Sequence, residues 1–558
     1  MTVPAARSIV RAVAVDFDGT LTRDGHLSRS GAQAVQEARR AGLRVVLVTG
    51  RILDELLEVA PDVTDRFDLI VGENGAVALY KDHLLPLADP IDDSFVQELV
   101  GLGTGVRRGR VIAALPASYH AIVAATLQQR ALDCQLITNR SELMILPAGV
   151  SKATGLEYAL EALGRSPHTT LAIGDAENDL AMLLSCEIGA AVGDSVEVLR
   201  AHADLTATDT DGDGVAEILR GPVVKGTRRV HPPRWHIPIG TDRDGKTVTL
   251  PTSQVNVLVT GPSGSGKSYI AGMLAERLLE LGYDMLIVDP EGDYATLGQL
   301  PKVLTLGEQA IPEPADVIAY LRRWGSLVLD LSTHTPSERD QFMNRLAPQL
   351  AALRDESGRP DWVLIDEAHY PYGQNAASSH FYRDLLSGHL VVTYAPEQLG
   401  ARVLESIDIT LTVSDDRSTV LVTRTDQQTP EIDVTVAHRR LGHLRHHHKY
   451  STWGVPPERG FWFREGPGPA NGAVAHNLDE LRRGLSGCSD VAVRHHAADH
   501  EFSRWVDQVF GDHALASEIA VVESRVQRAT DSIQLREASR QLSAIIAENL
   551  RQAEFSPP

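Results

Sequence analysis

Short apolar runs that end in acidic or small polar residues alternate with amphipathic stretches along the first three quarters of the chain. Runs such as VAVD at 13–16 and TLAIGD at 170–175 have the length of buried strands, and SGAQAVQEARRAG at 30–42 has helical spacing. Such alternation favours an α/β fold built on a parallel sheet. Because the pattern begins again near residue 239, we predict two doubly wound parallel-sheet domains, followed by a mainly helical C-terminal region.

Changes in composition suggest where these parts begin and end. Residues 1–220 form the first predicted domain, and 221–238 combine Gly, Pro and basic residues with little periodicity, as in a linker. The second α/β domain is expected over 239–435. Residues 436–558 begin with a His-rich connector and continue with helical spacing, which favours a docking or oligomerisation element.

Charge and cysteine usage narrow the class of protein. The formal net charge of −21 disfavours a surface that coats nucleic acid over its whole extent, although a local basic groove stays open. Cys134, Cys186 and Cys488 lack paired spacing, which suits a reducing cytoplasm. No apolar run reaches membrane-spanning length, and the first one leads into Asp16 rather than into a cleavage site. We therefore expect a cytoplasmic protein without a membrane segment.

Asp16 and Asp18 directly follow the first predicted strand, at the edge where open α/β sheets bind ligands. Two carboxylates there need a partner, and a bound cation with a phosphate would supply it; a capped turn on a surface strand is the alternative. Three further motifs follow in order: VTGR at 48–51, Lys152 at the start of a predicted helix, and GDAEND at 174–179.

In this order the motifs resemble those of the haloacid dehalogenase (HAD) superfamily, specifically phosphatases with a cap between the second and third motifs. The resemblance covers about residues 10–220, and GENGAV at 72–77 and DGDGVAEIL at 211–219 point to the Cof, phosphoglycolate or sugar phosphatase branch. It implies an α/β cap at about 80–150 and Mg²⁺ as cofactor. The residues that it implies for the site are Asp16 as nucleophile, Asp18 as general acid and base, Thr49 and Lys152 as phosphate holders, and Asp175 and Asp179 as magnesium ligands together with Asp16 and Asp18.

These roles are chemically consistent. A carboxylate can attack phosphorus and form an aspartyl phosphate only where a cation and a lysine offset the repulsion between its charge and the phosphoryl oxygens. A second carboxylate two residues on points to the same side of a continuing strand, so it can protonate the leaving oxygen and later activate water. The predicted substrate is a phosphorylated small molecule.

A second kind of phosphate site is predicted at GPSGSGKS, which lies between an apolar strand and a helical stretch and fits the phosphate-binding loop in full. Its glycines let backbone N–H groups surround the phosphates of ATP, while Lys267 reaches the outer phosphates and Ser268 holds magnesium. The predicted ATP-binding residues are Gly261, Pro262, Ser263, Gly264, Ser265, Gly266, Lys267 and Ser268, together with Asp366.

Two further apolar runs in this part end in acidic residues, MLIVDPEGDY at 285–294 and WVLIDEAHY at 362–370. Asp366 would organise the magnesium shell and Glu367 would orient the attacking water, which distinguishes ATP hydrolysis from simple nucleotide binding. With VTYAPEQL at 392–399, these motifs resemble the HerA and FtsK group of ring-forming ATPases over about 236–430. The resemblance makes a homo-oligomer an option, and three residues are candidate arginine fingers: Arg402, Arg417 and Arg424.

The sequence thus predicts a bifunctional enzyme, a phosphatase joined to an ATPase. One alternative is a nucleic-acid motor or end-processing enzyme, which the ATPase resemblance favours and the net charge disfavours. A second is a nucleotide-controlled assembly switch, which the complete sets of catalytic carboxylates disfavour. The His-rich segment at 438–450 could suggest a metal site, but a solvated basic connector explains its composition better.

Overall fold

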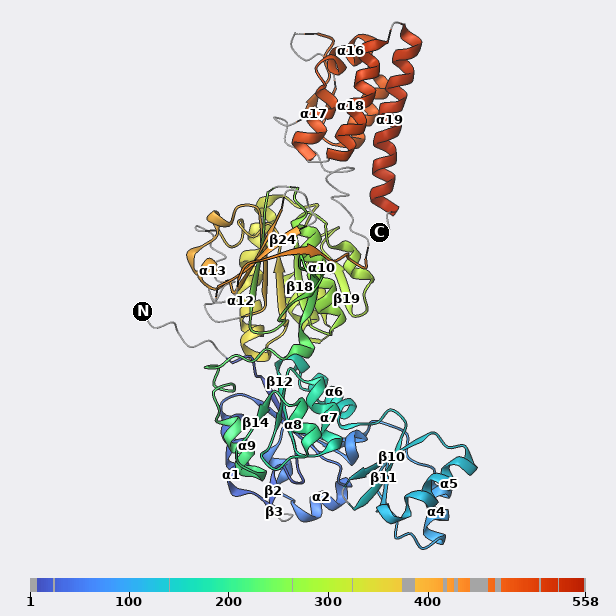
Figure 1. Cartoon of the computed structure of the whole chain (residues 1–558), viewed down its shortest axis with the longest axis vertical. Helices are drawn as coiled ribbons and strands as arrows, with labels where there is room; N and C mark the ends of the chain where they lie inside the picture. Colours follow the sequence, from blue (N-terminus) through green and yellow to red (C-terminus); the bar gives the residue numbers. More distant parts are fainter. Residues whose placement is uncertain are drawn as a thin grey trace.

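Three bodies follow one another along the chain, and the predicted α/β class with a helical C-terminal region is confirmed (Figure 1). The computed structural model describes residues 8–23, 26–139, 141–262, 264–323, 325–373, 387–414, 419–425, 430–441, 460–466, 473–510, 513–529 and 531–555. Ser263, Arg417 and most of the His-rich segment lie outside these residues. Within them, no helix combines the length and the apolar character needed to cross a bilayer.

The first domain contains an eight-stranded sheet in which six neighbouring strands run parallel and two at one edge are antiparallel. In spatial order the strands are β14 (Leu205–Thr206), β13 (Ile188–Ala191), β12 (Thr170–Gly174), β1 (Ala12–Asp16), β4 (Arg44–Val48), β5 (Leu69–Gly72), β6 (Val77–Tyr80) and β7 (His83–Pro86). A separate two-stranded hairpin is formed by β2 (Thr22–Arg23) and β3 (His26–Leu27).

Helices cover both faces of this sheet because successive strand residues point to opposite sides. Val13 and Val15 belong to one apolar cluster, and Ala12 and Ala14 to the other. The first cluster is covered by α1 (Arg29–Arg40), α2 (Leu53–Val59), α3 (Val63–Arg66) and α9 (Asp211–Leu219). The second is covered by α6 (Lys152–Ala162), α7 (Leu180–Ser185) and α8 (Glu197–His202).

A small α/β unit projects from this domain and corresponds to the cap (Figure 1). Its antiparallel sheet has the order β10 (Cys134–Asn139), β11 (Glu142–Pro147), β9 (Ala113–Pro116) and β8 (Arg107–Arg108). Its apolar cluster is completed by α4 (Asp93–Gly101) and α5 (His120–Arg130). Because β6 and β7 belong to the larger sheet, the cap occupies the later part of the segment predicted at 80–150.

The second domain is built on an eleven-stranded mixed sheet. Its strands are, in spatial order, β16 (Thr247–Leu250), β15 (Ile237–Thr241), β25 (Ile432–Val436), β24 (Thr419–Arg424), β23 (Ile409–Val413), β17 (Asn256–Thr260), β22 (His389–Thr393), β21 (Trp362–Ile365), β18 (Met285–Asp289), β20 (Ser326–Asp330) and β19 (Val303–Leu306). The last seven run parallel. Its α-helices include α10 (Lys267–Glu280), α11 (Pro314–Arg323), α12 (Pro336–Ser357) and α13 (Ala401–Glu405).

The C-terminal region forms a helical body with its own apolar core. Its helices are α15 (Leu478–Gly487), α16 (Asp490–Ala498), α17 (Glu501–Trp505), α18 (His513–Arg528) and α19 (Ser532–Phe555), and a short ribbon of β26 (Phe461–Trp462) and β27 (Val474–Ala475) packs with them. Phe461 stacks on Phe502 of α17 with ring centroids 5.0 Å apart, so the aromatic residues before the helices belong to this core.

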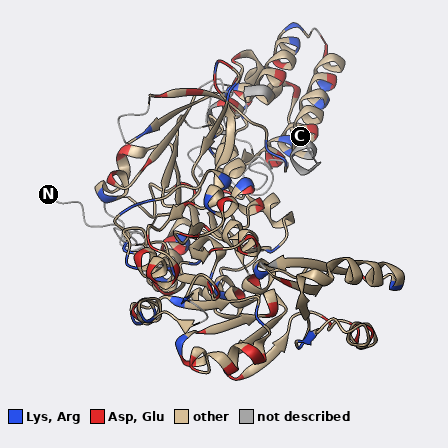
Figure 2. Cartoon of the chain, turned by 60° about the horizontal axis from the view of Figure 1, so that its bottom comes forward, with Lys and Arg blue, Asp and Glu red and all other residues tan. Residues whose placement is uncertain are grey.

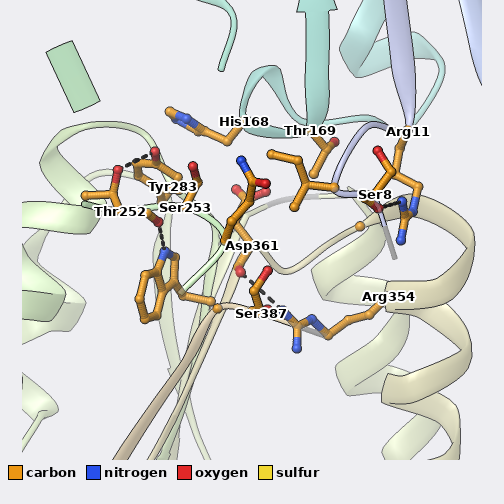
Figure 3. Close-up of a pocket in the computed structure, with 15 residues that line it drawn as sticks. Ser8, Arg11, His168, Thr169, Thr252, Ser253, Tyr283, Arg354, Asp361 and Ser387 are labelled. Carbon is orange, nitrogen blue, oxygen red and sulfur yellow. Dashed lines mark hydrogen bonds between the residues drawn. The ribbon is translucent and has the colours of Figure 1, made fainter. Parts of the chain in front are cut away.

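The two α/β domains are packed together rather than only tethered. His168 of the first stacks on Tyr283 of the second, with ring centroids 3.5 Å apart. Arg234, within the predicted linker, pairs with Asp204 at 2.7 Å. Figure 3 shows a small cavity at this seam. Its labelled lining residues are Ser8, Arg11, His168 and Thr169 from the first domain, and Thr252, Ser253, Tyr283, Arg354, Asp361 and Ser387 from the second.

Candidate active sites

The topology of the first sheet brings the predicted phosphatase residues together. Asp16 is the last residue of β1, which pairs in parallel with β4 on one side and with β12 on the other. Thr49 directly follows β4, and Asp175 directly follows β12. Because parallel neighbours end at the same edge, these three side chains meet where open α/β sheets bind ligands.

Lys152 connects the carboxylates at this edge. As the first residue of α6 it places its Nζ 2.6 Å from Asp16 Oδ1 and 2.5 Å from Asp179 Oδ1. All three side chains are almost completely buried. Burial raises the pKa of Asp16, as do the charges of Asp179 and Asp175, while Lys152 opposes that rise. Burial would lower the pKa of Lys152, but the charges of Asp16 and Asp179 raise it above its usual range.

Asp179 also shapes the turn that carries Asp175. Its Oδ2 accepts the backbone N–H groups of Asp175 and Ala176, both at 3.0 Å. Gly174 is required here because a Cβ would lie 2.6 Å from the Cβ of Asp179. Asp175 is held in turn by the hydroxyl of Thr20, which donates to its Oδ1 at 2.9 Å.

Asp16, Asp175 and Asp179 form a group that could hold a metal ion, since each offers an oxygen within 4.8 Å of the others. Carboxylate oxygens are the ligands that Mg²⁺ prefers in proteins. When ionised, the three buried carboxylates carry three negative charges, and the single lysine beside them offsets one. A divalent cation would balance the two negative charges that remain. The donor set therefore fits Mg²⁺.

The Asp18 carboxylate is paired with Arg51 and does not belong to the group formed by Asp16, Asp175 and Asp179, and the sequence did not predict this pairing. Its carboxylate receives a two-pronged contact from Arg51, with Nη2 donating to Oδ1 at 2.6 Å and Nε to Oδ2 at 2.7 Å. The guanidinium also lies 5.3 Å from the centroid of the Phe17 ring. Thr49 is fully buried, and its hydroxyl oxygen accepts the backbone N–H of Arg51. The assignments of Asp18 and Thr49 to metal or phosphate stay predictions.

The second candidate site lies at the carboxyl edge of the other sheet. The glycine-rich loop follows β17, and Lys267 is the first residue of α10. Gly261 and Gly266 have φ of 149° and 100°, a region that favours glycine. Lys267 donates from Nζ to the carbonyl oxygen of Pro262 at 2.8 Å, and burial lowers its pKa. Ser268 follows within the same first turn of the helix.

Asp366 and Glu367 follow β21, two strands from β17 in the sheet. Asp366 Oδ2 accepts the hydroxyl of the buried Tyr294 at 2.9 Å. Burial, reinforced by the charge of Asp293, raises the pKa of Asp366 to about 6. Tyr294 was not among the predicted site residues, although it ends the quoted stretch at 285–294.

Glu367 has a backbone conformation that a non-glycine residue seldom adopts, with φ of 49°. Its Oε2 lies 3.4 Å from Nδ1 of His369, which is also 3.0 Å from the hydroxyl of Thr393 at the end of β22. The sequence did not predict the contact between His369, which follows β21, and Thr393 of β22. Of the candidate arginine fingers, Arg402 lies in α13 and Arg424 ends β24, where it donates to the carbonyl oxygen of Thr249. Neither position distinguishes a finger.

Two family models match the chain. A model described as haloacid dehalogenase-like hydrolase matches residues 13–108 and 122–219, and one described as the central domain of the helicase HerA matches 241–346. Both predicted resemblances are therefore confirmed. The matched residues include the cluster around Lys152 in the first case and the glycine-rich loop in the second.

Curated relatives match the first domain over nearly their whole length. A phosphoglycolate phosphatase of Methanothermobacter thermautotrophicus is 30% identical, covering 38% of this chain and 98% of its own, and one of Archaeoglobus fulgidus is 29% identical, covering 38% and 96%. A solved haloacid dehalogenase-like hydrolase of Bacteroides thetaiotaomicron is 21% identical, covers 38% of this chain and 98% of its own, and gives a TM-score of 0.34. Through its first domain the chain belongs to the haloacid dehalogenase-like hydrolase family, and it carries a HerA-like domain behind it.

Proposed function

We propose that the chain is a bifunctional enzyme, in which a magnesium-dependent phosphomonoester hydrolase is joined to an ATP-hydrolysing domain. The observation that carries the first activity is the position of Lys152 between Asp16 and Asp179, beside Asp175. A buried lysine among three carboxylates suits a site that must bring a dianionic phosphate against a carboxylate nucleophile.

In the proposed mechanism, a carboxylate oxygen of Asp16 attacks phosphorus, the bond to the ester oxygen breaks, and an aspartyl phosphate forms. Asp18 gives its proton to the leaving oxygen and then takes one from the water that hydrolyses the intermediate. Lys152 orients the phosphoryl oxygens and offsets their charge. Bound Mg²⁺, held by Asp16, Asp175 and Asp179, would supply electrostatic stabilisation of the transferred group.

Arg51 is part of this mechanism because its guanidinium donates to both carboxylate oxygens of Asp18, the residue that exchanges protons with the leaving oxygen and with water. An anionic substrate would compete with Asp18 for the guanidinium, since a fork of N–H donors binds phosphate or carboxylate oxygens equally well. The substrate we propose is a small phosphorylated metabolite. Phosphoglycolate, after which the two archaeal relatives are named, is the first compound to test.

For the second domain we propose that ATP binds the loop 261–268, with Lys267 on the outer phosphates and Ser268 and Asp366 on the magnesium ion that accompanies ATP. Glu367 would orient the attacking water. His369, two residues further along the same segment, lies beside Glu367, and Thr393 at the end of the neighbouring strand β22 fixes the ring of His369 in that position.

A nucleic-acid motor or end-processing enzyme is the second candidate, because the second family model is named after the helicase HerA. Charge argues against it. In Figure 2, Lys and Arg lie among Asp and Glu along the visible helices rather than in one stripe, and the net charge is −21. We further propose a cytoplasmic location, which three free cysteines suit, and homo-oligomerisation as an option of the HerA-like domain.

The test measures both activities in two variants. Asp16→Asn should lose phosphate release from 4-nitrophenyl phosphate to below about a tenth of the parent rate, because an amide cannot act as the nucleophile. Glu367→Gln should bind ATP yet hydrolyse it at below about a tenth of the parent rate, because the amide loses the charge that orients water. Each variant should keep the other activity within about threefold.

The controls separate the two halves of the proposal. Removal of Mg²⁺ should stop both activities in the parent. Phosphatase activity that survives in Asp16→Asn would contradict the assignment of the nucleophile, whereas unchanged ATP turnover in Glu367→Gln would contradict only the second half. Loss of both activities in either folded variant would indicate that the two reactions share one composite site instead of using two separate sites.

A further inference from the structure

The turn between β5 and β6 has a strained backbone. It is the 3₁₀ turn Glu73–Gly75, in which Glu73 has φ of 54° and Asn74 has φ of 56°. Two successive non-glycine residues in the left-handed region are uncommon, and such strain persists only where the surroundings impose it. The proposed mechanism gives none of these residues a role.

The Glu73 carboxylate is fully buried and is used entirely for the cap. Its Oε1 accepts the backbone N–H of Arg110 at 2.8 Å, and its Oε2 accepts those of Val111 at 2.8 Å and Ile112 at 3.1 Å. Gly109 precedes them, and a Cβ there would lie 2.6 Å from Glu73 Oε2. One side chain of the large domain thus holds the loop 109–112, which leads into β9 of the cap.

The backbone of the same turn is bonded to the catalytic motifs. The N–H of Glu73 donates to the carbonyl oxygen of Arg51, and the N–H of Asn74 to that of Thr49, both at 2.9 Å. The side-chain amide of Asn178 donates to Asn74 Oδ1 at 3.3 Å. The turn therefore touches the second motif through its backbone and the GDAEND turn through Asn74.

Gly75 brings the turn against the start of α6, where Lys152 lies. A Cβ at Gly75 would be 1.9 Å from the carbonyl oxygen of Ser151, and its φ is 106°. Gly155, one turn further along the helix, is equally constrained, because its Cβ would lie 2.6 Å from the Cα of Gly75. Three motifs and the cap loop thus meet at one three-residue turn.

We propose that Glu73 is a positioning residue for the phosphatase, which fixes the cap over the active site by holding the three amides of the loop 109–112. This inference rests on the proposed phosphatase activity. A carboxylate has acceptors for all three N–H groups and no donor, whereas an amide of the same shape would direct its own N–H groups at them. Because the backbone of the same turn also bonds to Thr49 and Arg51 of the second motif, one turn fixes the position of both the cap loop and the backbone of Arg51.

Exposed ion pairs between the cap and the large domain do not replace this contact. Arg110 pairs with Asp54 at 3.0 Å and Arg107 with Glu55 at 2.6 Å, and all four side chains are 36 to 55% exposed. Pairs of this exposure add little because water and salt screen them. Asp54 therefore offers a matched control, since Asp54→Asn removes a cap contact to the same residue, Arg110, without touching the buried one.

The first measurement is hydrogen exchange of the full-length chain, followed by mass spectrometry on peptides that cover residues 105–116. Glu73→Gln should speed exchange of the amides of Arg110, Val111 and Ile112 by at least about tenfold, since hydrogen bonds to a buried charged group are strong. Asp54→Asn should leave it within about twofold. Gly109→Ala, which presses a methyl group on the same carboxylate, should reproduce the effect without changing any charge.

The second measurement compares two esters, phosphoglycolate and the bulkier 4-nitrophenyl phosphate. A loosened cap should lower kcat/KM for the small ester about tenfold or more, because closure orients it, and should change that for the aryl ester by less than about threefold. A smaller folded fraction would instead lower kcat/KM for both esters by the same factor and leave the ratio of the two values unchanged. Asp54→Asn should keep the parent ratio.

Unchanged exchange at the loop, or parallel loss of both activities, in folded Glu73→Gln would overturn the proposal. If the parent hydrolyses neither ester, the proposed phosphatase function fails instead. The exchange experiment still decides in that case whether Glu73 holds the cap loop.

Discussion

At the scale of single residues, Lys152 is the cation on which the buried carboxylates of the first site depend. It lies 2.6 Å from Asp16 and 2.5 Å from Asp179, and all of these side chains are buried. Removing one partner of a buried ion pair leaves an uncompensated charge, which is strongly destabilising. We therefore predict that Lys152→Met lowers the free energy of unfolding by about 3 kcal/mol in the absence of metal.

Magnesium should reverse much of that loss, because a bound divalent cation supplies the missing positive charge and binds only the folded site. The measurement is the unfolding temperature with and without Mg²⁺. The rise on adding Mg²⁺ should be larger for Lys152→Met than for the parent, and the exposed control Lys225→Met should behave as the parent does. A variant whose unfolding temperature ignores Mg²⁺ would argue against a metal at Asp16, Asp175 and Asp179.

The sequence predicted some residues of this site better than others. Asp16, Lys152, Asp175 and Asp179 come from motifs with fixed spacing, and they converge in the structure. The engagement of Asp18 by Arg51 depends on a side-chain conformation that spacing does not determine. Glu73 lay in the quoted stretch 72–77, but its three amide donors come from a loop of the cap that no local pattern connects to it.

At the scale of elements, the start of α6 sets the position of Lys152. Ser151 caps this helix: its hydroxyl oxygen accepts the N–H of Thr154 at 3.3 Å, and the Thr154 hydroxyl accepts the N–H of Ser151 at 2.9 Å. Ser151→Ala should lower the free energy of unfolding by about 1 kcal/mol and reduce phosphatase kcat, because the first helical residue loses its anchor. Denaturant unfolding and kcat for 4-nitrophenyl phosphate test this prediction.

Ser489 provides the matched control, since it caps α16 in the C-terminal body in the same way. Ser489→Ala should affect the stability of that body and leave kcat of the phosphatase unchanged. An equal fall of kcat in both variants would mean that capping acts on the chain as a whole and not through Lys152.

Elements were predictable where the pattern of apolar residues was unambiguous. β1 and β12 are continuous apolar runs, and α1 has regular helical spacing. The hairpin β6–β7 was not separable from the cap by sequence, because an antiparallel strand pair has the same alternation in either sheet. Its place in the large sheet is fixed by pairing of Val71 with Ala78, a contact that only the three-dimensional structure supplies.

At the scale of the whole molecule, the composition of residues 221–238 predicted a linker but not how the domains meet. His168 is fully enclosed at the seam and contacts two acceptors. Its Nε2 lies 3.1 Å from the carbonyl oxygen of Leu281 at the end of α10, and its Nδ1 lies 3.0 Å from Glu187 Oε2, which also accepts the hydroxyl of Tyr283. Two acceptors require two ring N–H groups, so the geometry favours the imidazolium form.

The pKa of His168 follows from these neighbours. Burial alone would lower it, but the hydrogen bond and charge of Glu187 raise it above 6.5, with further support from the charges of Asp361 and Asp284. A histidine whose pKa is higher in the folded than in the unfolded protein contributes stability that is complete below about pH 6.5. That contribution is lost as the pH rises through the higher folded value. Asp361 loses its proton at a lower pH than His168, since burial raises the pKa of Asp361 only to about 6.

We predict that the parent loses stability between pH 6.5 and the raised pKa of His168, and that His168→Gln, which keeps a donor but cannot titrate, removes this slope. The contribution should be about 1 kcal/mol, the size of a protonated histidine at the end of a helix. Calorimetric unfolding of both proteins across this range measures it, with the exposed His202→Gln as a control that keeps the parent slope. Because Glu187 and His168 belong to the first domain and Tyr283 and Leu281 to the second, the lost stability should appear as earlier separation of the domains. Coincident pH profiles for the parent and His168→Gln would mean that His168 does not titrate in this range, and that its stacking on Tyr283 and the hydrogen bond from Tyr283 to Glu187 join the two domains there without its positive charge.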